Sequence, residues 1–209
     1  MRKLAYAERM SSSRPARDLE LVQIVDAALA DAARKAGEWL ACRPGCTQCC
    51  VGAFAISALD AARLREGLEA LQQRDSVRAE RLQARARAYV KRTSADFPGD
   101  PETGILADDE DSQEAFENFG NEEPCPVLDP KTGMCDLYEY RPMTCRVFGP
   151  PVRNEGGGLG ICELCFHGAT RQQIAACEMN PDPENLEESI LDEMPSKSEN
   201  TIVAFVLAR

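Results

Sequence analysis

Four cysteines fall within nine residues of one stretch, CRPGCTQCC at positions 42–50. The whole chain of 209 residues contains ten cysteines and a single histidine. Such a stretch can belong to a disulfide framework, a reactive thiol pair or a metal site, and each of these constrains the fold differently. Simple packing is a weak explanation, because a buried cysteine usually packs alone as a small hydrophobic residue.

The compartment decides between these alternatives. The opening sequence, MRKLAYAERMSSSRPARD, is basic but has no apolar stretch long enough for a signal peptide, and no window approaches the ~20 apolar residues of a membrane span. We therefore expect a cytoplasmic protein with reduced thiols. Its cysteines then indicate metal ligands or redox chemistry, and disulfides are expected only if an export signal has been removed.

The charge balance bears on partners. The chain has 35 acidic and 24 Lys and Arg residues, which gives a formal net charge of −11. Nucleic acids and anionic membranes both attract basic proteins. We therefore expect neither nucleic acid nor a membrane as a partner. The cysteines indicate a metal ion as the partner, and we leave a protein partner open.

Hydrophobic periodicity predicts helices in the first half of the chain. Apolar residues recur at steps of three and four over 15–40, and Pro44-Gly45 interrupts the pattern. Ser57 and Asp60 resemble a capping box that starts a second helix. A third, basic helix is expected over 76–91. Its arginines could form a docking surface. We favour the alternative that they form a solvent-exposed face, while the opposite, apolar face of the helix is buried.

The rest of the chain is less regular. The acidic segment 97–123 is interpreted as an exposed excursion or a short helix within a long loop. The segment 124–177 is rich in Pro, Gly and Cys, although Pro142 predicts a short helix carrying Cys145. A helix is expected near the C-terminus within 183–194, whereas TIVAFVLA after Asn200 fits either a helix or a strand.

These patterns predict a mainly α fold class. We expect a single domain over 1–209, with an irregular, loop-rich cysteine region organised around metal. Its parts are a helical portion, cysteine-rich segments, and a C-terminal helix with its tail. The expected bounds are about 15–95 for the helical portion, 42–56 and 124–177 for the cysteine-rich segments, and 183–209 for the C-terminal part.

The spacing of the first four cysteines suggests how they meet. They occupy relative positions 0, 4, 7 and 8, which share one face of a continuous helix. Proline is tolerated only in the first turn, so we expect a helix to begin near Pro44 and to carry Cys46, Cys49 and Cys50, with Cys42 approaching from the preceding segment. The dipole at the helix N-terminus would stabilise thiolates.

Further cysteines follow turn signals or form a close pair. Cysteines held by turns can converge on a metal ion, and Cys162 and Cys165 have the two-residue spacing common among zinc ligands. Cys177 and His167 are left open between ligation and ordinary packing. The candidate metal ligands are Cys42, Cys46, Cys49, Cys50, Cys125, Cys135, Cys145, Cys162 and Cys165.

Three motifs resemble the CxxCxxCC (YkgJ-like) cysteine-cluster family, which is described as zinc- or iron-chelating. They are GCTQCC, the block CPVLD…GMCDLYEYRPMTCRVFGP, and a looser GICELC. The family name has two residues between its first two cysteines, where this chain has Arg43-Pro44-Gly45. The resemblance implies metal chelation by Cys46, Cys49, Cys50, Cys125, Cys135 and Cys145.

Two arginines bracket Cys145. A guanidinium can donate hydrogen bonds to clustered thiolates or to their backbone. We favour this role for Arg141 and Arg146, next to the metal-bound thiolates. The alternative is that both arginines pair with surface carboxylates.

Three functions remain. The first is a metal-binding protein that holds zinc or iron, with an iron–sulfur cluster as one form. Its candidate thiolates exceed one tetrahedral site, so two sites or one multinuclear site are expected. The second is a metal-dependent enzyme, because the cluster is similar to that of flagellin lysine N-methylases. The third is a scaffold in which zinc stabilises an interaction surface that includes the basic helix.

Whether the chain is an enzyme stays open. It has no nucleotide-binding glycine loop, no HExxH and no GxSxG. Catalytic residues are therefore unknown. The nearest acid–base candidates, from sequence proximity alone, are Glu163, Tyr138 and His167.

Overall fold

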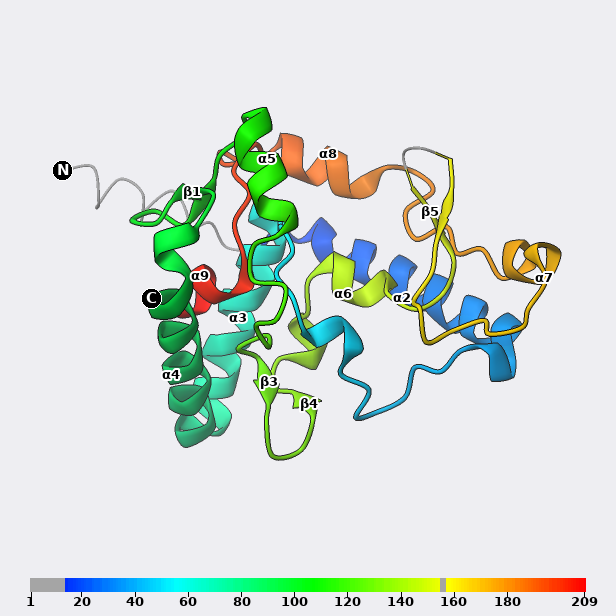
Figure 1. Ribbon diagram of the computed structural model, residues 1–209, viewed down its shortest axis with the longest axis horizontal. Coiled ribbons are helices and arrows are strands. Elements are labelled where there is room, and N and C mark those ends of the chain that lie inside the picture. Colours follow the sequence, from blue (N-terminus) through cyan, green and yellow to red (C-terminus); the bar gives the residue numbers. More distant parts are fainter. Residues whose placement is uncertain (1–13, 155–156) are drawn as a thin grey trace. The chain divides into compact units, whose positions relative to one another are not determined.

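The computed structural model describes residues 14–154 and 157–209 (Figure 1). In these residues α-helices predominate, and every strand is two residues long and belongs to a two-stranded antiparallel hairpin. The mainly α fold class is therefore confirmed. No helix in this part of the chain combines the length and the apolar character needed to cross a membrane.

The chain forms two compact units, each built from separate stretches of sequence. The first unit contains Thr47–Pro142 and Leu191–Arg209, and the second contains Pro15–Cys46 and Met143–Ile190. The boundary between Cys46 and Thr47 passes through the cysteine-rich stretch itself. The expectation of a single domain stays a prediction.

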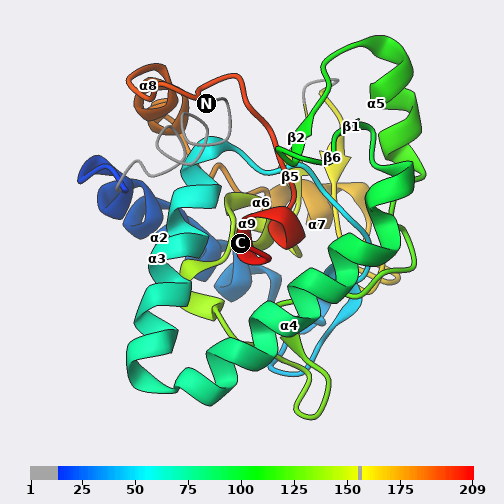
Figure 2. The ribbon, with the colours of Figure 1, turned by 90° about the vertical axis from the view of Figure 1, so that its left-hand side faces the viewer.

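Three helices form the core of the first unit. They are α3 (Ala58–Arg74), α4 (Ser76–Thr93) and the short α9 (Val203–Leu207), which lies against both of the others (Figures 1 and 2). The predicted cap is present, because Ser57 Oγ accepts a hydrogen bond from the Asp60 backbone N–H at 3.2 Å. The main buried side chains are Leu64, Leu68, Leu71, Leu82, Val206 and Leu207.

Tertiary packing decides the conformation of the ambiguous C-terminal segment. All five residues of α9 are buried, so the apolar run is surrounded by protein on all sides, as in a core helix. The segment before it pairs in extended form with the entry to α3, because Ile56 and Thr201 exchange backbone hydrogen bonds of 2.8 and 3.0 Å.

The acidic segment contains the short helix that the sequence suggested. Strands β1 (Gly99–Asp100) and β2 (Ile105–Leu106) form a hairpin, and α5 (Glu110–Glu117) follows it. The 3₁₀ turn η3 (Ser94–Asp96) precedes them. Phe97 and Phe119 are buried on either side of this segment and belong to one hydrophobic cluster, so apolar packing anchors both ends of an otherwise polar excursion.

The second unit is built on a long helix. Helix α2 (Arg17–Ala36) continues into the 3₁₀ turn η1 (Gly37–Trp39), as expected over 15–40. It packs against α6 (Met143–Val147), which begins directly after Pro142 as predicted. Further along the chain follow β5 (Val152–Arg153), β6 (Leu159–Gly160), α7 (Arg171–Ala176) and α8 (Leu186–Asp192). The 3₁₀ turn η4 (Tyr138–Tyr140) belongs to the first unit.

The predicted helix at Pro44 is wrong. The segment instead forms two tight turns, in which the Cys46 N–H donates to Arg43 O and the Cys50 N–H donates to Thr47 O, both at 2.9 Å; the second is the 3₁₀ turn η2 (Gln48–Cys50). Gly45 and Gly52 have φ values of 88° and 100°. These values lie outside the right-handed helical region, so a continuous helix is interrupted at both glycines.

A glycine lets the segment after the cysteine hairpin approach α3 closely. A Cβ atom at Gly67 would lie 2.6 Å from Cβ and Cγ of Tyr140, which belongs to η4. Real Cβ contacts are longer, so only glycine fits here without displacing the ring. Gly67 thereby controls how closely the segment between Cys135 and Arg141 docks on the helical core.

We expect Gly67→Ala to destabilise the protein, although alanine is the better helix former by about 1 kcal/mol. Overpacking of this kind costs about 1–3 kcal/mol of folding stability, because the Tyr140 side chain would have to move. Chemical denaturation measures the change. Glu69→Ala, at an exposed position of the same helix, is the control and should be nearly neutral. Equal stability of Gly67→Ala and wild type would contradict the close approach.

Candidate metal centre

Backbone pairing joins two distant cysteine-bearing segments in the first unit. The Cys125 N–H donates to Cys50 O at 2.7 Å, and the Gly52 N–H donates to Glu123 O at 3.0 Å. Val51 and Pro124 form an antiparallel bridge between these bonds. The end of the first cysteine stretch therefore lies alongside the start of the second.

A small hairpin brings a fourth cysteine to the same place. Strands β3 (Leu128–Asp129) and β4 (Met134–Cys135) pair so that Cys135 lies opposite Leu128. The Asp136 N–H donates to Val127 O at 2.9 Å, which extends the pairing toward Cys125. The first unit thus gathers Cys49, Cys50, Cys125 and Cys135 from three separate turns.

The adjacent thiols of Cys49 and Cys50 are hydrogen-bonded to each other, and their pKa values shift in opposite directions. Their mutual hydrogen bond, helped by the charge of Arg141, lowers the pKa of Cys49 to about 6. The same hydrogen bond raises the pKa of Cys50, with burial and the nearby Cys125 and Cys135 adding to the effect. Cys49 is therefore the thiolate of the pair at neutral pH, and thiolate is the form that binds metal.

Backbone N–H groups are directed at the two other sulfurs. Burial raises the pKa of Cys125 to about 12, while N–H groups of Val127 and Leu128 oppose this increase. Burial likewise raises the pKa of Cys135, against a hydrogen bond from the Leu137 N–H. Such donors stabilise negative charge on sulfur, so these turns are suited to hold thiolates once a cation compensates for burial.

Arg141 lies beside this group. It is 8% exposed, its guanidinium stacks on the Tyr138 ring at 4.0 Å from the centroid, and Nη1 donates to Tyr138 O at 2.9 Å. Its positive charge lowers the pKa of Cys49 and opposes the rise at Cys135. Arg141 is therefore held in place next to two thiols, while its predicted hydrogen bonding to metal-bound sulfur stays a prediction.

Two arginines of α4 also hold the hairpin. The buried Asp136 carboxylate accepts a bond of 2.5 Å from Arg78 Nε and another of 2.5 Å from Arg85 Nη2. Arg85 Nε also donates to Pro126 O at 2.8 Å. These contacts hold the residues directly after Cys125 and Cys135. The sequence predicted the buried face of this helix but missed the clamp, because its arginines and Asp136 are 58 and 51 positions apart.

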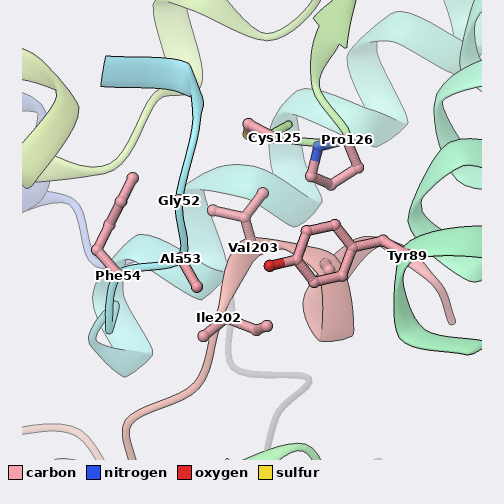
Figure 3. Close-up of a pocket in the computed structure, with 9 residues that line it drawn as sticks. Gly52, Ala53, Phe54, Tyr89, Cys125, Pro126, Ile202 and Val203 are labelled. Carbon is pink, nitrogen blue, oxygen red and sulfur yellow. The ribbon is translucent and has the colours of Figure 1, made fainter. Parts of the chain in front are cut away.

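A small cavity adjoins Cys125 in the first unit. Figure 3 shows the hydroxyl of Tyr89 directed into it, toward Ala53, Ile202 and Val203. Its volume of about 20 Å³ matches one water molecule rather than an organic substrate. Burial, with Glu123 and Cys125 nearby, raises the pKa of Tyr89 to about 12, so its hydroxyl keeps its proton at neutral pH.

Other cysteines gather within the second unit. The Ala41 N–H donates to Cys165 Sγ at 3.4 Å. Cys42 is an exposed residue, but partial desolvation of its thiol raises its pKa to about 12, and the thiol of Cys165, which is hydrogen-bonded to it, adds to this together with Cys162 and Cys46. Cys42, Cys46, Cys162 and Cys165 are therefore neighbours in this unit.

The remaining candidates also lie in the second unit. Cys145 and Arg146 are on α6, and the Arg146 guanidinium, 1% exposed, pairs with Asp26 of α2 through contacts of 2.8 and 2.9 Å. This is the carboxylate pairing that was the alternative for Arg146, though at a buried position. Cys177 is buried with Cys162 and Cys165 in one apolar cluster. A ligand role for Cys145 stays a prediction, and Cys177 stays open between ligation and ordinary packing.

His167, the only histidine, borders a wider cavity of about 460 Å³ in the second unit. Glu38, Trp39 and Leu164 line it as well. The structure thus places this acid–base candidate at a solvent-accessible hollow.

The chemistry of the first group fits a thiophilic metal. Across residues 14–154 and 157–209, no three Cys, His, Asp or Glu side chains lie in the arrangement that a single bound metal ion requires. All ten cysteines are free thiols, however, and those of the first group come with backbone N–H donors and a fixed cation. Soft sulfur donors of this kind select zinc and iron rather than magnesium or calcium.

Comparisons with known proteins support this chemistry. A search of curated proteins and a search of solved structures gave no match. A protein family matches residues 41–157, more than half of the chain, and its description is "putative zinc- or iron-chelating domain". This range contains the first cysteine stretch, Cys125 and Cys135. The chain belongs to the CxxCxxCC family.

Proposed function

We propose that this protein binds zinc or iron through the thiolates of Cys49, Cys50, Cys125 and Cys135. The observation that carries the proposal is the backbone pairing of Cys50 with Cys125, together with the hairpin that returns Cys135 beside them. Residues so far apart in sequence do not meet by local preference. Their convergence supports a common ligand.

Electrostatics supports a cation at this place. Four thiols gathered in a partly buried site resist deprotonation together, because thiolate charges repel and burial disfavours each of them. The raised pKa values of Cys50, Cys125 and Cys135 express this resistance. A bound metal ion reverses it, since a coordinating thiol is deprotonated outright.

The metal would also order the hairpin. Each strand here has two residues, which offers little burial against a backbone ordering cost of about 1–2 kcal/mol per residue. Structural zinc contributes roughly 10–16 kcal/mol of apparent binding free energy in small modules. A metal-stabilised hairpin therefore needs no extended sheet, and the predicted organisation of this region around metal follows from the same argument.

Tetrathiolate coordination suits either zinc or an iron–sulfur cluster, and the two differ in colour. A reducing compartment such as the cytoplasm suits both, because ligand thiols must stay reduced. The scaffold alternative loses part of its proposed contact surface, since Arg78 and Arg85 engage Asp136 and no longer form a free basic face. Within residues 14–154 and 157–209, no contact among catalytic candidates favours the enzyme alternative.

Cys135→Ser should lower the metal content of protein purified without oxygen, because it removes one of the four proposed ligands. The segment 124–142 should become sensitive to limited proteolysis at the same time. Elemental analysis and absorption spectroscopy measure the metal. Cys177→Ser, the same substitution at a buried cysteine outside this group, should retain it.

Two results would count against the proposal. Wild-type metal content in Cys135→Ser would show that the hairpin cysteine is not a ligand. Metal-free wild-type protein with an intact fold and all thiols reactive would exclude the function itself.

Arg141→Ala should weaken metal retention by roughly 10- to 100-fold, because it removes the cation that offsets thiolate charge. Competition with a chromogenic chelator measures this affinity. Arg87→Ala is the matched control, since Arg87 is exposed on α4. Arg78 is unsuitable as a control because it contacts Asp136. Equal affinities for Arg141→Ala and Arg87→Ala would contradict the role of Arg141.

A further inference from the structure

The second unit contains a cysteine group that the family match covers only in part. Cys162 and Cys165 lie beyond residue 157, where the matched range ends. Cys42 and Cys46 lie within that range but belong to the second unit. The family motif includes Cys46, but neither the family resemblance nor the proposed site in the first unit joins it to Cys42, Cys162 and Cys165.

Backbone contacts fix two of these residues beside each other. The Phe166 N–H donates to Trp39 O at 2.8 Å, so the segment after η1 runs alongside the end of the Cys162–Cys165 pair. The Ala41 N–H then donates to Cys165 Sγ at 3.4 Å. Because Cys42 is the next residue along the chain, this contact brings its backbone to the Cys165 sulfur.

Gly149 joins the other pair. A Cβ at this residue would lie 2.8 Å from Cys42 Sγ, so the sulfur packs directly on the Gly149 backbone. The Cys162 N–H approaches Gly149 O at 3.5 Å. Gly149 has a φ of 124°, in the region that favours glycine. Gly149 thus leaves room for the Cys42 sulfur on one side while its carbonyl faces the Cys162 backbone.

Each close pair is held in a turn that suits metal ligation. The Cys165 N–H donates to Cys162 O at 2.9 Å, and the Cys46 N–H donates to Arg43 O at 2.9 Å. Short turns of this kind, with two or three intervening residues, hold two ligands of a tetrahedral zinc site. Two such turns supply four sulfurs, which is the full complement.

The geometry points to a second metal site formed by Cys42, Cys46, Cys162 and Cys165, which takes zinc or another thiophilic divalent ion. It rests on the proposed function in that the protein binds such a metal at all, but it uses none of the same ligands. Its role is structural. The ion ties the end of α2 to the irregular segment between α6 and α7, whose strands have only two residues each.

Titration of the full chain with Co²⁺ tests the inference. Metal is removed with a chelator under reducing conditions without oxygen, and thiolate-to-cobalt charge-transfer absorption is followed. Wild type should bind two equivalents. A Cys162→Ser, Cys165→Ser double variant should bind one, and a Cys125→Ser, Cys135→Ser double variant should also bind one.

The outcomes separate this inference from the proposed function. One equivalent in wild type and one in the Cys162→Ser, Cys165→Ser variant would overturn the second site alone. Two equivalents in that variant would also overturn it. No binding by wild type would end both proposals.

Alkylation of wild-type protein covers the case in which a variant fails to fold. Zn²⁺ should protect all four of these cysteines together against a thiol reagent, and a chelator should expose them together, as read by peptide mass spectrometry. A disulfide between Cys162 and Cys165 in the reduced preparation, or protection of only one pair, would overturn the site.

Gly149→Ala tests the position of Cys42 without touching a ligand. The added Cβ should push the Cys42 sulfur away, with loss of the second equivalent of Co²⁺ and retention of the first. Gly168→Ala is the matched control, because Gly168 also has a positive φ, of 80°, and an added Cβ would meet nothing within 4 Å. Two equivalents in Gly149→Ala, or equal loss in both variants, would contradict the assigned geometry.

Discussion

The hydrogen bond from the Cys125 N–H to Cys50 O is the contact on which the proposed metal site of the first unit depends. It joins the first cysteine stretch to the segment that leads into the β3–β4 hairpin. Arg78 and Arg85 of α4 hold the hairpin through Asp136 and Pro126. The cysteines are therefore carried by turns, whereas the helices behind them supply the rigid support.

Burial and charge work against each other in these turns. Buried thiols prefer to stay protonated, yet the N–H donors at Cys125 and Cys135 and the guanidinium of Arg141 all favour thiolate. A chain that needed only apolar packing would have no use for these donors. The proposed metal ion would resolve the conflict, because it would supply the positive charge that offsets the thiolates and contribute binding free energy to segments with little core of their own.

Local signals explain which parts of the fold could be predicted. The cap at Ser57, the apolar steps of α2 and the proline before α6 are encoded within a few residues, and each was confirmed. The helix at Pro44 failed because Gly45 and Gly52 adopt conformations that no spacing rule reveals. The division of the first cysteine stretch between two units, and the Asp136 clamp, depend on contacts between segments far apart in sequence. Composition and periodicity give no information about such contacts.

X-ray absorption at the metal edge, on wild-type protein purified without oxygen, tests the central claim most directly. Thiolate coordination predicts about four sulfur neighbours of zinc at about 2.3 Å. An iron–sulfur cluster would show sulfur neighbours together with a short iron–iron distance. A coordination sphere made mainly of nitrogen and oxygen, or protein that contains neither metal, would contradict the account.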